Sequence, residues 1–399
     1  MVLRVYGTTV HESSPDAVPP MLRFLQTGDW HLGQAYRKFD AGLADRLRAS
    51  RLDVIGRILR EAERSGSAFV AVTGDQFDGP RPDPLLVRGM LERIGDSEVA
   101  VHMIPGNHDP CGPGSVYERG DFKARPKNLH FHGHPRPVSL PDQDATLFPC
   151  PCSARFGDDP LTWIPPRGPG QGWRIALAHG ALPIATGGDE RNYPIADDAP
   201  RRYDLDYVAL GDWHTATPDP RRTPSERMYY AGAPEVGGWD ETGAGFALEV
   251  VLEPGLQPRV RPIRVGRHEW SELHPTLYST EDVGRLAHEL ERLASPDRVV
   301  RVRPSGSLSL GVREALQEVI DGRAATFAGL DLDASDLRLA LDGDGGPPSD
   351  PILREVYRRL LRLGADPSDG FPKAFPRGLP APDGDVIARA MSQFRGLMN

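Results

Sequence analysis

The sequence predicts an α/β protein with two packed sheets and a smaller α+β module, on three observations. Strand-type apolar runs alternate with stretches of helical period between residues 22 and 104, the order that gives a mostly parallel sheet with crossover helices. Strand-type runs with fewer helices follow between residues 146 and 253, which predicts a second sheet packed on the first. After about residue 265 the pattern changes to short helices and strands.

The predicted elements of the main domain can be placed in order. Leu43, Leu47, Val54, Ile55 and Ile58 recur at roughly helical spacing and predict a helix over 43–58. A second helix is expected over 84–94. Strands are expected over 22–27, 68–73, 99–104, 146–150, 173–178, 207–210, 228–232 and 245–253. Beyond residue 265 we expect helices over 280–294, 312–320, 351–364 and 385–397, and strand-type segments over 298–304 and 326–341.

These patterns divide the chain into four parts. We expect a lead-in over 1–20, a main domain over 21–265, an α+β module over 266–342, and a linker with C-terminal helices over 343–399. The first 20 residues lack the long apolar stretch and cleavage site of a signal peptide. Met21 stands directly before the first strand and is an alternative translation start to Met1.

Composition limits the class of protein. The net charge of −9 argues against a general nucleic-acid binder, but bound divalent cations would invert the charge of an acidic site, so nucleic acid stays open as a substrate. No apolar run is long enough to span a membrane. The 3 cysteines show neither disulfide nor zinc spacing. We therefore expect a cytoplasmic protein without membrane contact.

Five loops that follow apolar runs carry side chains of metal-ligand type. They read GDWH (28–31), GDQFD (74–78), GNHD (106–109), AHG (178–180) and GDWH (211–214). Taken singly, a Gly-Asp after a strand is most often a turn, and a lone His179 can be a buried structural residue. Ligands of open α/β sheets gather at the carboxyl ends of strands, however, so the five loops together should converge. Oxygen and imidazole donors suit Mn²⁺, Fe or Zn²⁺, and two such cations can clamp a phosphoryl group and activate water.

The motifs D-x-H, GDxxD, GNHD, a lone His and G-x-x-H resemble the calcineurin-like metallophosphoesterase superfamily. DWHLGQAYR, GDQFDGPRP and MIPGNHDP are most similar to its SbcD/Mre11 group of DNA repair nuclease subunits. The resemblance covers residues 22–265 and implies a four-layer α/β/β/α sandwich, with a capping module after it. It also implies two divalent metal ions, Mn²⁺ first, with Fe, Zn²⁺ or Mg²⁺ as alternatives.

The resemblance assigns roles to individual positions. The first metal would be held by Asp29, His31 and His214, with Asp75 bridging the two ions, and the second by Asn107, His179 and Asp212. His108 would be the non-ligating histidine that protonates the leaving oxygen or stabilises the transition state. Asp78 resembles the carboxylate that orients this histidine.

Position 212 departs from the family pattern. The family has G-H-x-H there, and this chain reads GDWH. Asp212 can ligate in place of histidine, bind through a water molecule, or leave the site with a single metal. We expect direct or near-direct ligation, because aspartate is a ligand for hard metals.

Several further residues have both a functional and a structural interpretation. Trp30 and Trp213 can stack on a base or sugar, or pack their loops against the domain. Arg37 can contact a phosphate or form a surface ion pair. His130, His132 and His134 share one strand face, where a solvated edge is favoured over a metal site. The arginine-rich helix over 351–364 can dock a partner or cover the core.

The sequence thus predicts a metal-dependent phosphodiesterase acting on DNA as an exonuclease or endonuclease. By resemblance, such subunits form homodimers and work with a Rad50/SbcC-like SMC-type ATPase. One alternative is a stand-alone phosphatase or cyclic-nucleotide phosphodiesterase of the same superfamily. Another is a non-catalytic scaffold whose second metal site has degraded at Asp212.

Overall fold

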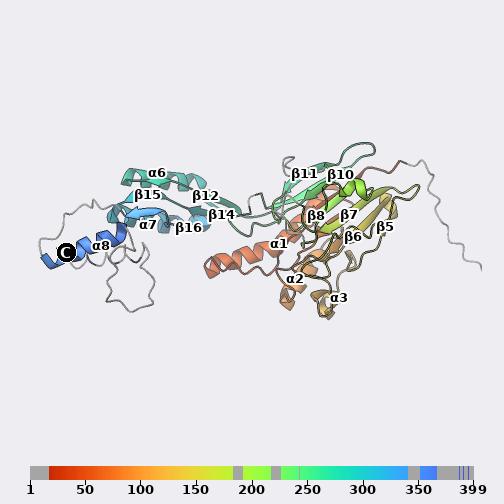
Figure 1. Ribbon diagram of the computed structural model, residues 1–399, viewed down its shortest axis with the longest axis horizontal. Helices are drawn as coiled ribbons and strands as arrows, with labels where there is room; N and C mark the ends of the chain where they lie inside the picture. Colours follow the sequence, from red (N-terminus) through yellow and green to blue (C-terminus); the bar gives the residue numbers. More distant parts are fainter. Residues whose placement is uncertain are drawn as a thin grey trace, which may run out of the picture. The chain divides into compact units, whose positions relative to one another are not determined.

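The computed structural model describes residues 18–182, 192–216, 226–241, 243–339 and 351–365, with residues 386, 390 and 394. The chain forms two compact units that divide between Arg267 and His268 (Figure 1). Most of the predicted lead-in, the linker after residue 342 and most of the predicted helix over 385–397 lie outside the described residues. None of the described helices is both long and apolar enough to cross a membrane.

A six-stranded sheet forms the first half of unit one, in the order β11-β10-β1-β2-β3-β4. Neighbouring strands from β1 to β4 are parallel, as the alternation of strands and helices predicts, whereas β10 and β11 add to the edge antiparallel. The strands are β1 (Leu22–Thr27), β2 (Phe69–Thr73), β3 (Ala100–Ile104), β4 (Leu129–Phe131), β10 (Phe246–Leu252) and β11 (Arg259–Arg264).

A five-stranded sheet with the order β5-β6-β7-β8-β9 packs on the first. Its strands are β5 (Val138–Leu140), β6 (Ala145–Cys150), β7 (Trp173–His179), β8 (Tyr207–Gly211) and β9 (Met228–Tyr230). All adjacent pairs except β5–β6 are parallel. Phe24, Phe69 and Tyr207 lie in the apolar layer between the sheets. The predicted second sheet is therefore confirmed.

Helices cover the outer face of the first sheet. They are α1 (Ala41–Ser65), α2 (Pro84–Gly95) and the short α3 (Gly120–Lys123), with a 3₁₀ turn over Val116–Glu118. Val54 and Ile58 of α1 pack with Met90 of α2 against Val70 and Val72 of β2. The helix α1 runs beyond the predicted residue 58 because buried Leu59 and Ala62 continue its apolar stripe.

The outer face of the second sheet carries the short helix α5 (Ala199–Arg202) and irregular segments that contribute Leu161 and Ile164 to a third apolar cluster. A 3₁₀ turn over Pro141–Gln143 joins β5 to β6. The arrangement is the predicted α/β class with two central sheets, and its fourth layer is built mostly from loops.

The second unit contains two three-stranded parallel sheets. Their strand orders are β12-β14-β16 and β13-β15-β17. They are β12 (Glu269–Leu273), β13 (Thr276–Leu277), β14 (Ser295–Val302), β15 (Ser305–Leu308), β16 (Phe327–Leu332) and β17 (Leu337–Leu339). Helices α6 (Thr280–Leu293) and α7 (Leu310–Arg323), with a 3₁₀ turn over Ala324–Thr326, connect them. Helix α8 (Pro351–Ala365) places Tyr357 against Leu310 and Phe394.

A histidine cluster lies on β3 and β4. The Nδ1 atom of His102 is 3.0 Å from Nε2 of His132, and the His102 ring stacks on that of His130 at a centroid distance of 4.9 Å. His102 comes from the neighbouring strand, so sequence spacing within 129–134 does not reveal it, and His134 is exposed beyond β4. Burial lowers the pKa of His102 to about 3 and that of His132 to about 4.

These buried rings should make the protein sensitive to acid. The unfolded chain protonates His102 near pH 6.5, whereas the folded protein does so only near pH 3. Between these values the unfolded state binds more protons, so the free energy of unfolding decreases as the pH falls. We expect a loss of about 2 kcal/mol from His102 between pH 7 and pH 5, measured by urea denaturation.

The matched variants are His102→Gln, which should lack this part of the pH dependence, and His134→Gln, which should keep it. An unchanged pH slope in the His102 variant would contradict the assignment.

Candidate metal centre

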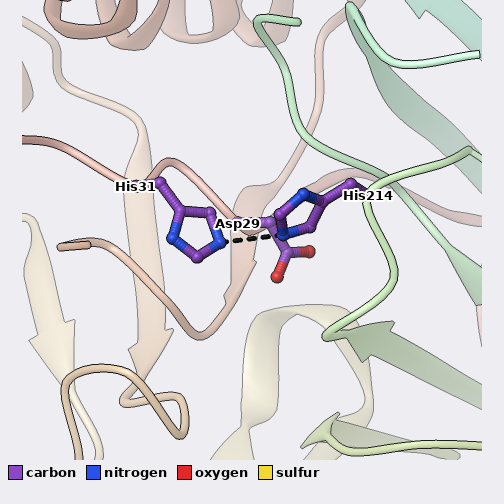
Figure 2. A group of neighbouring side chains, drawn as sticks. All are labelled: Asp29, His31 and His214. Atoms are coloured by element: carbon purple, nitrogen blue, oxygen red, sulfur yellow. Dashed lines mark hydrogen bonds between the residues drawn. The ribbon is translucent and has the colours of Figure 1, made fainter. Parts of the chain in front are cut away.

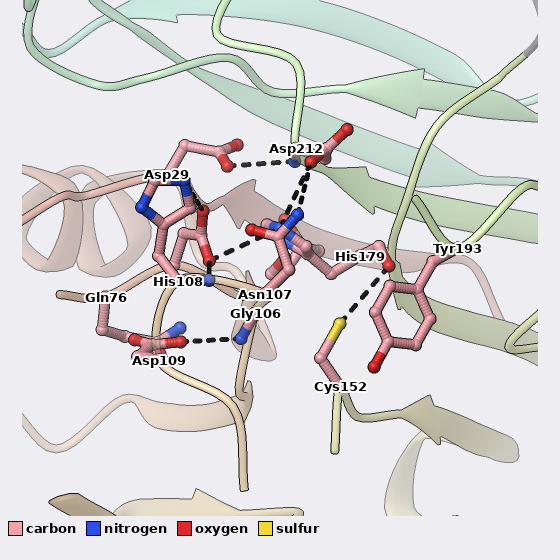
Figure 3. Close-up of polar contacts among 12 residues, drawn as sticks. Asp29, Gln76, Gly106, Asn107, His108, Asp109, Cys152, His179, Tyr193 and Asp212 are labelled. Atoms are coloured by element: carbon pink, nitrogen blue, oxygen red, sulfur yellow. Dashed lines mark hydrogen bonds and ion pairs between the residues drawn. The ribbon is translucent and has the colours of Figure 1, made fainter. Parts of the chain in front are cut away.

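The five predicted loops converge at the carboxyl ends of β1, β2, β3, β7 and β8 (Figure 3). The loops after β1 and β2 run side by side, because the Asp29 N–H donates to the Gly74 carbonyl and the His31 N–H to the Asp75 carbonyl, both at 3.0 Å. The hydrogen-bonded pairing of the parallel strands thus continues past their ends. This continuation places side chains from separate loops next to one another.

Several residues of the centre have left-handed backbone conformations, which are uncommon outside glycine. The φ angles are 51° at Asp29, 43° at His31, 54° at Asp75 and 103° at Asp212. Such conformations persist only where the surroundings hold them, and they gather at functional sites. Gly106 adds a steric constraint, because a Cβ atom there would lie 2.1 Å from Oδ1 of Asp75.

Asp29, His31 and His214 form the first group of potential ligands (Figure 2). The Nε2 atoms of His31 and His214 face each other at 2.9 Å. Two imidazole nitrogens that ligate one ion at about 2.0–2.1 Å lie roughly 3 Å apart when they occupy neighbouring positions. The arrangement of these donors therefore fits a shared divalent ion.

A second group of potential ligands consists of Asp29, Asp75 and His179. Asp75 in this group also faces the first group. Its Oδ2 atom is 3.5 Å from Nε2 of His31, and its Oδ1 atom is 3.5 Å from Nε2 of His179. Each oxygen thus faces a different group, which is the position required of a bridging carboxylate.

The three histidines of the two groups turn their Nδ1 atoms toward oxygen atoms. The partners are Oδ1 of Asp78 at 3.5 Å for His31, Oε1 of Glu241 at 2.7 Å for His214, and the carbonyl of Thr73 at 2.8 Å for His179. With Nδ1 as the donor in His179 and His214, the Nε2 lone pairs of these rings face the carboxylates. This is the usual way in which proteins orient metal-binding histidines.

Four buried atoms in the centre have no hydrogen-bond partner among the described residues. They are Oδ2 of Asp29, Oδ1 of Asn107, Nε2 of His179 and Nδ1 of His31. Buried polar atoms are nearly always paired, so such atoms need an explanation. The first three can donate an electron pair to a cation, and the residues present therefore fit divalent metal ions.

The electrostatics agree with this fit. Asp29 and Asp75 are buried, and among the described residues only histidines form ion pairs with Asp75. Burial raises the pKa of Asp29 despite the nearby histidines. For His179, burial lowers the pKa, but the carboxylates of Asp75, Asp29 and Asp212 outweigh it and raise the value to about 9. The centre holds a negative potential that cations would neutralise.

His108 lies beside the two groups and is partly accessible, as His214 is, whereas His31 and His179 are buried. Its backbone N–H donates to Oδ1 of Asp75 at 2.9 Å, and its Nε2 atom is 4.0 Å from Oδ2 of the same residue. Its ring packs edge-on against His31. The side chain is 30% exposed, compared with 0% for His179, so His108 can reach a bound molecule.

The predicted role of the Asp78 carboxylate requires a correction. The Nδ1 atom of His108 faces the main-chain carbonyl of Asp78 at 3.2 Å, whereas the carboxylate faces His31. The reason is that Asp78 runs beside the first loop, with its N–H donating to the Leu32 carbonyl. His31, Asp78 and His108 also form a third group of mutually close potential ligand atoms.

Asp109 ties two of the loops together. Its Oδ1 atom accepts the N–H of Gly106 at 2.8 Å, and its Oδ2 atom accepts the N–H of Phe77 at 2.9 Å. Burial raises its pKa to about 6. Asp109 thereby fixes the loop that carries Asn107 and His108 relative to the loop that carries Asp75.

Asp212 meets the centre through its backbone and its side chain. Its N–H donates to Oδ1 of Asp29 at 3.0 Å. Its carboxylate accepts hydrogen bonds from Asn107 and Asn192 and lies 3.7 Å from Nε2 of His179. Sequence reasoning missed Asn192 and Glu241, because neither stands in a strand-end motif of metal-ligand type.

The three predicted substrate contacts, Trp30, Trp213 and Arg37, differ in how far they are buried. Trp30 is 2% exposed and donates from Nε1 to Oγ1 of Thr27, so it packs its loop and offers no stacking surface, which corrects that prediction. Trp213 is half-buried against the outer apolar cluster of the second sheet. Arg37 is exposed in the segment between β1 and α1.

Three comparisons with known proteins describe what the chain is similar to. Residues 22–216 match the family model of the calcineurin-like phosphoesterases. TT1561 of Thermus thermophilus is similar in structure, with 10% identity, coverage of 62% of this chain and 100% of that chain, and a TM-score of 0.38. GAP50, the anchor in the inner membrane complex of Plasmodium, has 14% identity, coverage of 61% and 85%, and a TM-score of 0.34. No curated protein matches the sequence.

The contact between Glu241 and His214 generates a prediction about metal affinity. Replacing Glu241 by glutamine removes the charge that holds the Nδ1–H of His214, and loss of such a partner weakens metal binding by about 10–100-fold. We expect this decrease for the tighter of the bound ions, measured by calorimetric titration of the metal-free protein with Mn²⁺.

The neighbouring carboxylate of Asp240 is exposed and supplies the control. Asp240→Asn should bind Mn²⁺ like the wild type. Equal affinities for the Glu241 variant and the wild type would show that Glu241 does not support the ligand.

Proposed function

From the match of residues 22–216 to the calcineurin-like phosphoesterase family model, we propose that the protein is a metal-dependent phosphodiesterase that cleaves DNA, as subunits of the SbcD/Mre11 group do. The domain assignment itself indicates a hydrolase that acts on phosphoester bonds with divalent metals. The observation that carries the proposal is the pair of ligand groups that share Asp29, with Asp75 of the second group 3.5 Å from His31 of the first, and the partly accessible His108 beside them.

The ligand groups define where the ions would be held. Asp29, His31 and His214 would hold the first, His179 and Asn107 the second, and Asp75 both. Two ions at this place would neutralise the phosphoryl oxygens and activate water for attack on phosphorus. The side chains themselves orient the donors through the Nδ1 contacts of the three histidines.

His108 is the residue placed to move a proton. With Nδ1–H donated to the Asp78 carbonyl, its Nε2 atom is the one that can face a substrate. Burial lowers the pKa of His108, which makes its protonated ring a stronger acid toward a leaving oxygen. Its exposure allows contact with the phosphoester, whereas the ligand histidines His31 and His179 are buried.

Two features support DNA as the substrate. The residues around the metal motifs, DWHLGQAYR, GDQFDGPRP and MIPGNHDP, resemble those of the nuclease group. A second compact unit also follows from His268, and the proposal assigns it the capping module over 266–342 that positions DNA. Homodimer formation and a Rad50/SbcC-like ATPase partner belong to the same proposal, with α8 as the candidate docking helix.

A small phosphoester is the second candidate substrate. The net charge of −9 and the burial of Trp30 favour it, since both reduce the features expected of a nucleic-acid surface. A stand-alone phosphatase or cyclic-nucleotide phosphodiesterase would use the same ligand groups and the same histidine.

Activity assays separate these candidates. With Mn²⁺ present, we expect the wild type to cleave linear double-stranded and single-stranded DNA as well as bis-p-nitrophenyl phosphate. His108→Ala should lower kcat by about 10²–10⁴-fold, the usual contribution of a general acid, while still binding the metal. His134→Ala, an exposed histidine outside the centre, should retain full activity.

The outcomes divide clearly. Hydrolysis of p-nitrophenyl phosphate or cyclic nucleotides without DNA cleavage would replace the nuclease by the small-ester enzyme. A fully metal-loaded protein that cleaves no phosphoester would be a scaffold.

A further inference from the structure

Asp212 takes part in a compact hydrogen-bond network with two asparagines. Oδ1 of Asp212 accepts from Nδ2 of Asn107 and from Nδ2 of Asn192, each at 3.1 Å, and Oδ2 accepts from Nδ2 of Asn192 at 2.9 Å. Nδ2 of Asn107 also donates to Oδ1 of Asn192 at 2.8 Å. Figure 3 shows Asn107 and Asp212 facing each other beside His179.

The chemistry of the groups fixes the orientation of both amides. An ionised carboxylate only accepts hydrogen bonds, whereas an amide has one accepting and one donating end. Both asparagines must therefore turn N–H groups to Asp212. The two hydrogens on Nδ2 of Asn107 are used by Asp212 and Asn192, so its Oδ1 atom points away from them, and that atom is buried without a partner among the described residues.

Asp212 itself is poorly placed as a ligand. Both of its oxygens already accept amide hydrogens, and its shortest contact with His179 is 3.7 Å. Among the described residues, the groups of mutually close ligand atoms include Asp29, Asp75 and His179 but leave Asp212 out. By contrast, Oδ1 of Asn107 and Nε2 of His179 are buried and have no hydrogen-bond partner within the described part of the chain.

We propose that Asp212 and Asn192 are positioning residues, which together turn the Asn107 carbonyl oxygen toward the second metal position, and that Asp212 is not itself a ligand. The inference rests on the metal centre of the proposed function. The clamp formed by Asp212 and Asn192 replaces the ligand that the family pattern G-H-x-H would supply at position 212.

Unequal metal affinity follows from this arrangement. The first position has two imidazoles, from His31 and His214, together with Asp29 and a share of Asp75. The second has one imidazole, from His179, the neutral amide oxygen of Asn107 and the other share of Asp75, and Asp29 lies close to both positions. The positions therefore differ by an imidazole at the first and an amide oxygen at the second. An amide oxygen is the weaker donor, so the two ions should bind in separate steps.

Titration of the metal-free full-length protein with Mn²⁺ tests the proposal, with calorimetry for affinity and electron paramagnetic resonance for the coupled ion pair. The wild type should bind one ion tightly and a second more weakly. Asn192→Ala should weaken the second step by about tenfold or more, as expected for the loss of a residue that orients a ligand. It should leave the first step unchanged.

Two further variants sharpen the test. Asp212→Asn, which lets the Asn107 amide flip, should weaken the second step to a similar degree, and combining it with Asn192→Ala should add little because both act through Asn107. Tyr193→Phe is the matched control: its hydroxyl holds the neighbouring segment through Ser153 and Ala154 but does not touch the clamp. It should bind both ions normally.

The outcomes are separable from those of the activity assay, because metal binding needs no substrate. If Asp212→Asn abolishes the second step and Asn192→Ala leaves it unchanged, Asp212 is a direct ligand and the proposal is overturned. Equal affinities of the two wild-type steps would also overturn it. Unequal binding that depends on Asn192, in a protein that cleaves no DNA, would support the clamp and refute only the nuclease proposal.

Discussion

The metal centre depends on one hydrogen bond between the two sheets, from Nδ1 of His179 at the end of β7 to the carbonyl of Thr73 at the end of β2. It forms because the backbones approach closely there: a Cβ atom on Gly211 would lie 2.1 Å from that same carbonyl. Gln26 adds a second link, donating from β1 to the Leu210 carbonyl in β8. These two hydrogen bonds hold the strand ends of the two sheets together. Loops from both sheets can therefore contribute ligands to one site.

The buried charges of the centre lower the stability of the folded protein. Asp29 and Asp75 are buried, and among the described residues only histidines form ion pairs with Asp75. Burying charged groups is costly even when they are paired. The apolar layers around Phe24 and Val54 supply the stability elsewhere. The left-handed backbone at Asp29, His31 and Asp75 is also unfavourable for folding, and such conformations gather at functional sites, where side chains must converge.

The sequence alone predicted much of the fold and the positions of the ligand loops, because both depend on local patterns. The apolar run 68–73 and the Gly-Asp that follows it are visible without a structure. The exposed edge strand β11, with its alternating arginines, shows no apolar signal and was missed. Asn192 and Glu241 act through long-range contacts across 20 and 27 positions, and no local pattern encodes such contacts. Trp30 was misread because spacing cannot tell which way an aromatic ring turns.

The backbone of Asp212 supports the centre independently of its side chain. The backbone N–H of Asp212 holds Oδ1 of Asp29, a contact that any residue except proline can make. Its φ of 103° is more accessible to aspartate than to bulky or β-branched residues. The backbone contact is thus independent of the side chain, which leaves the side chain free to differ from histidine. A carboxylate there can be satisfied by the amides of Asn107 and Asn192, so the substitution adds no unpaired charge facing the first ligand group, and His214, two residues on, keeps its place beside His31.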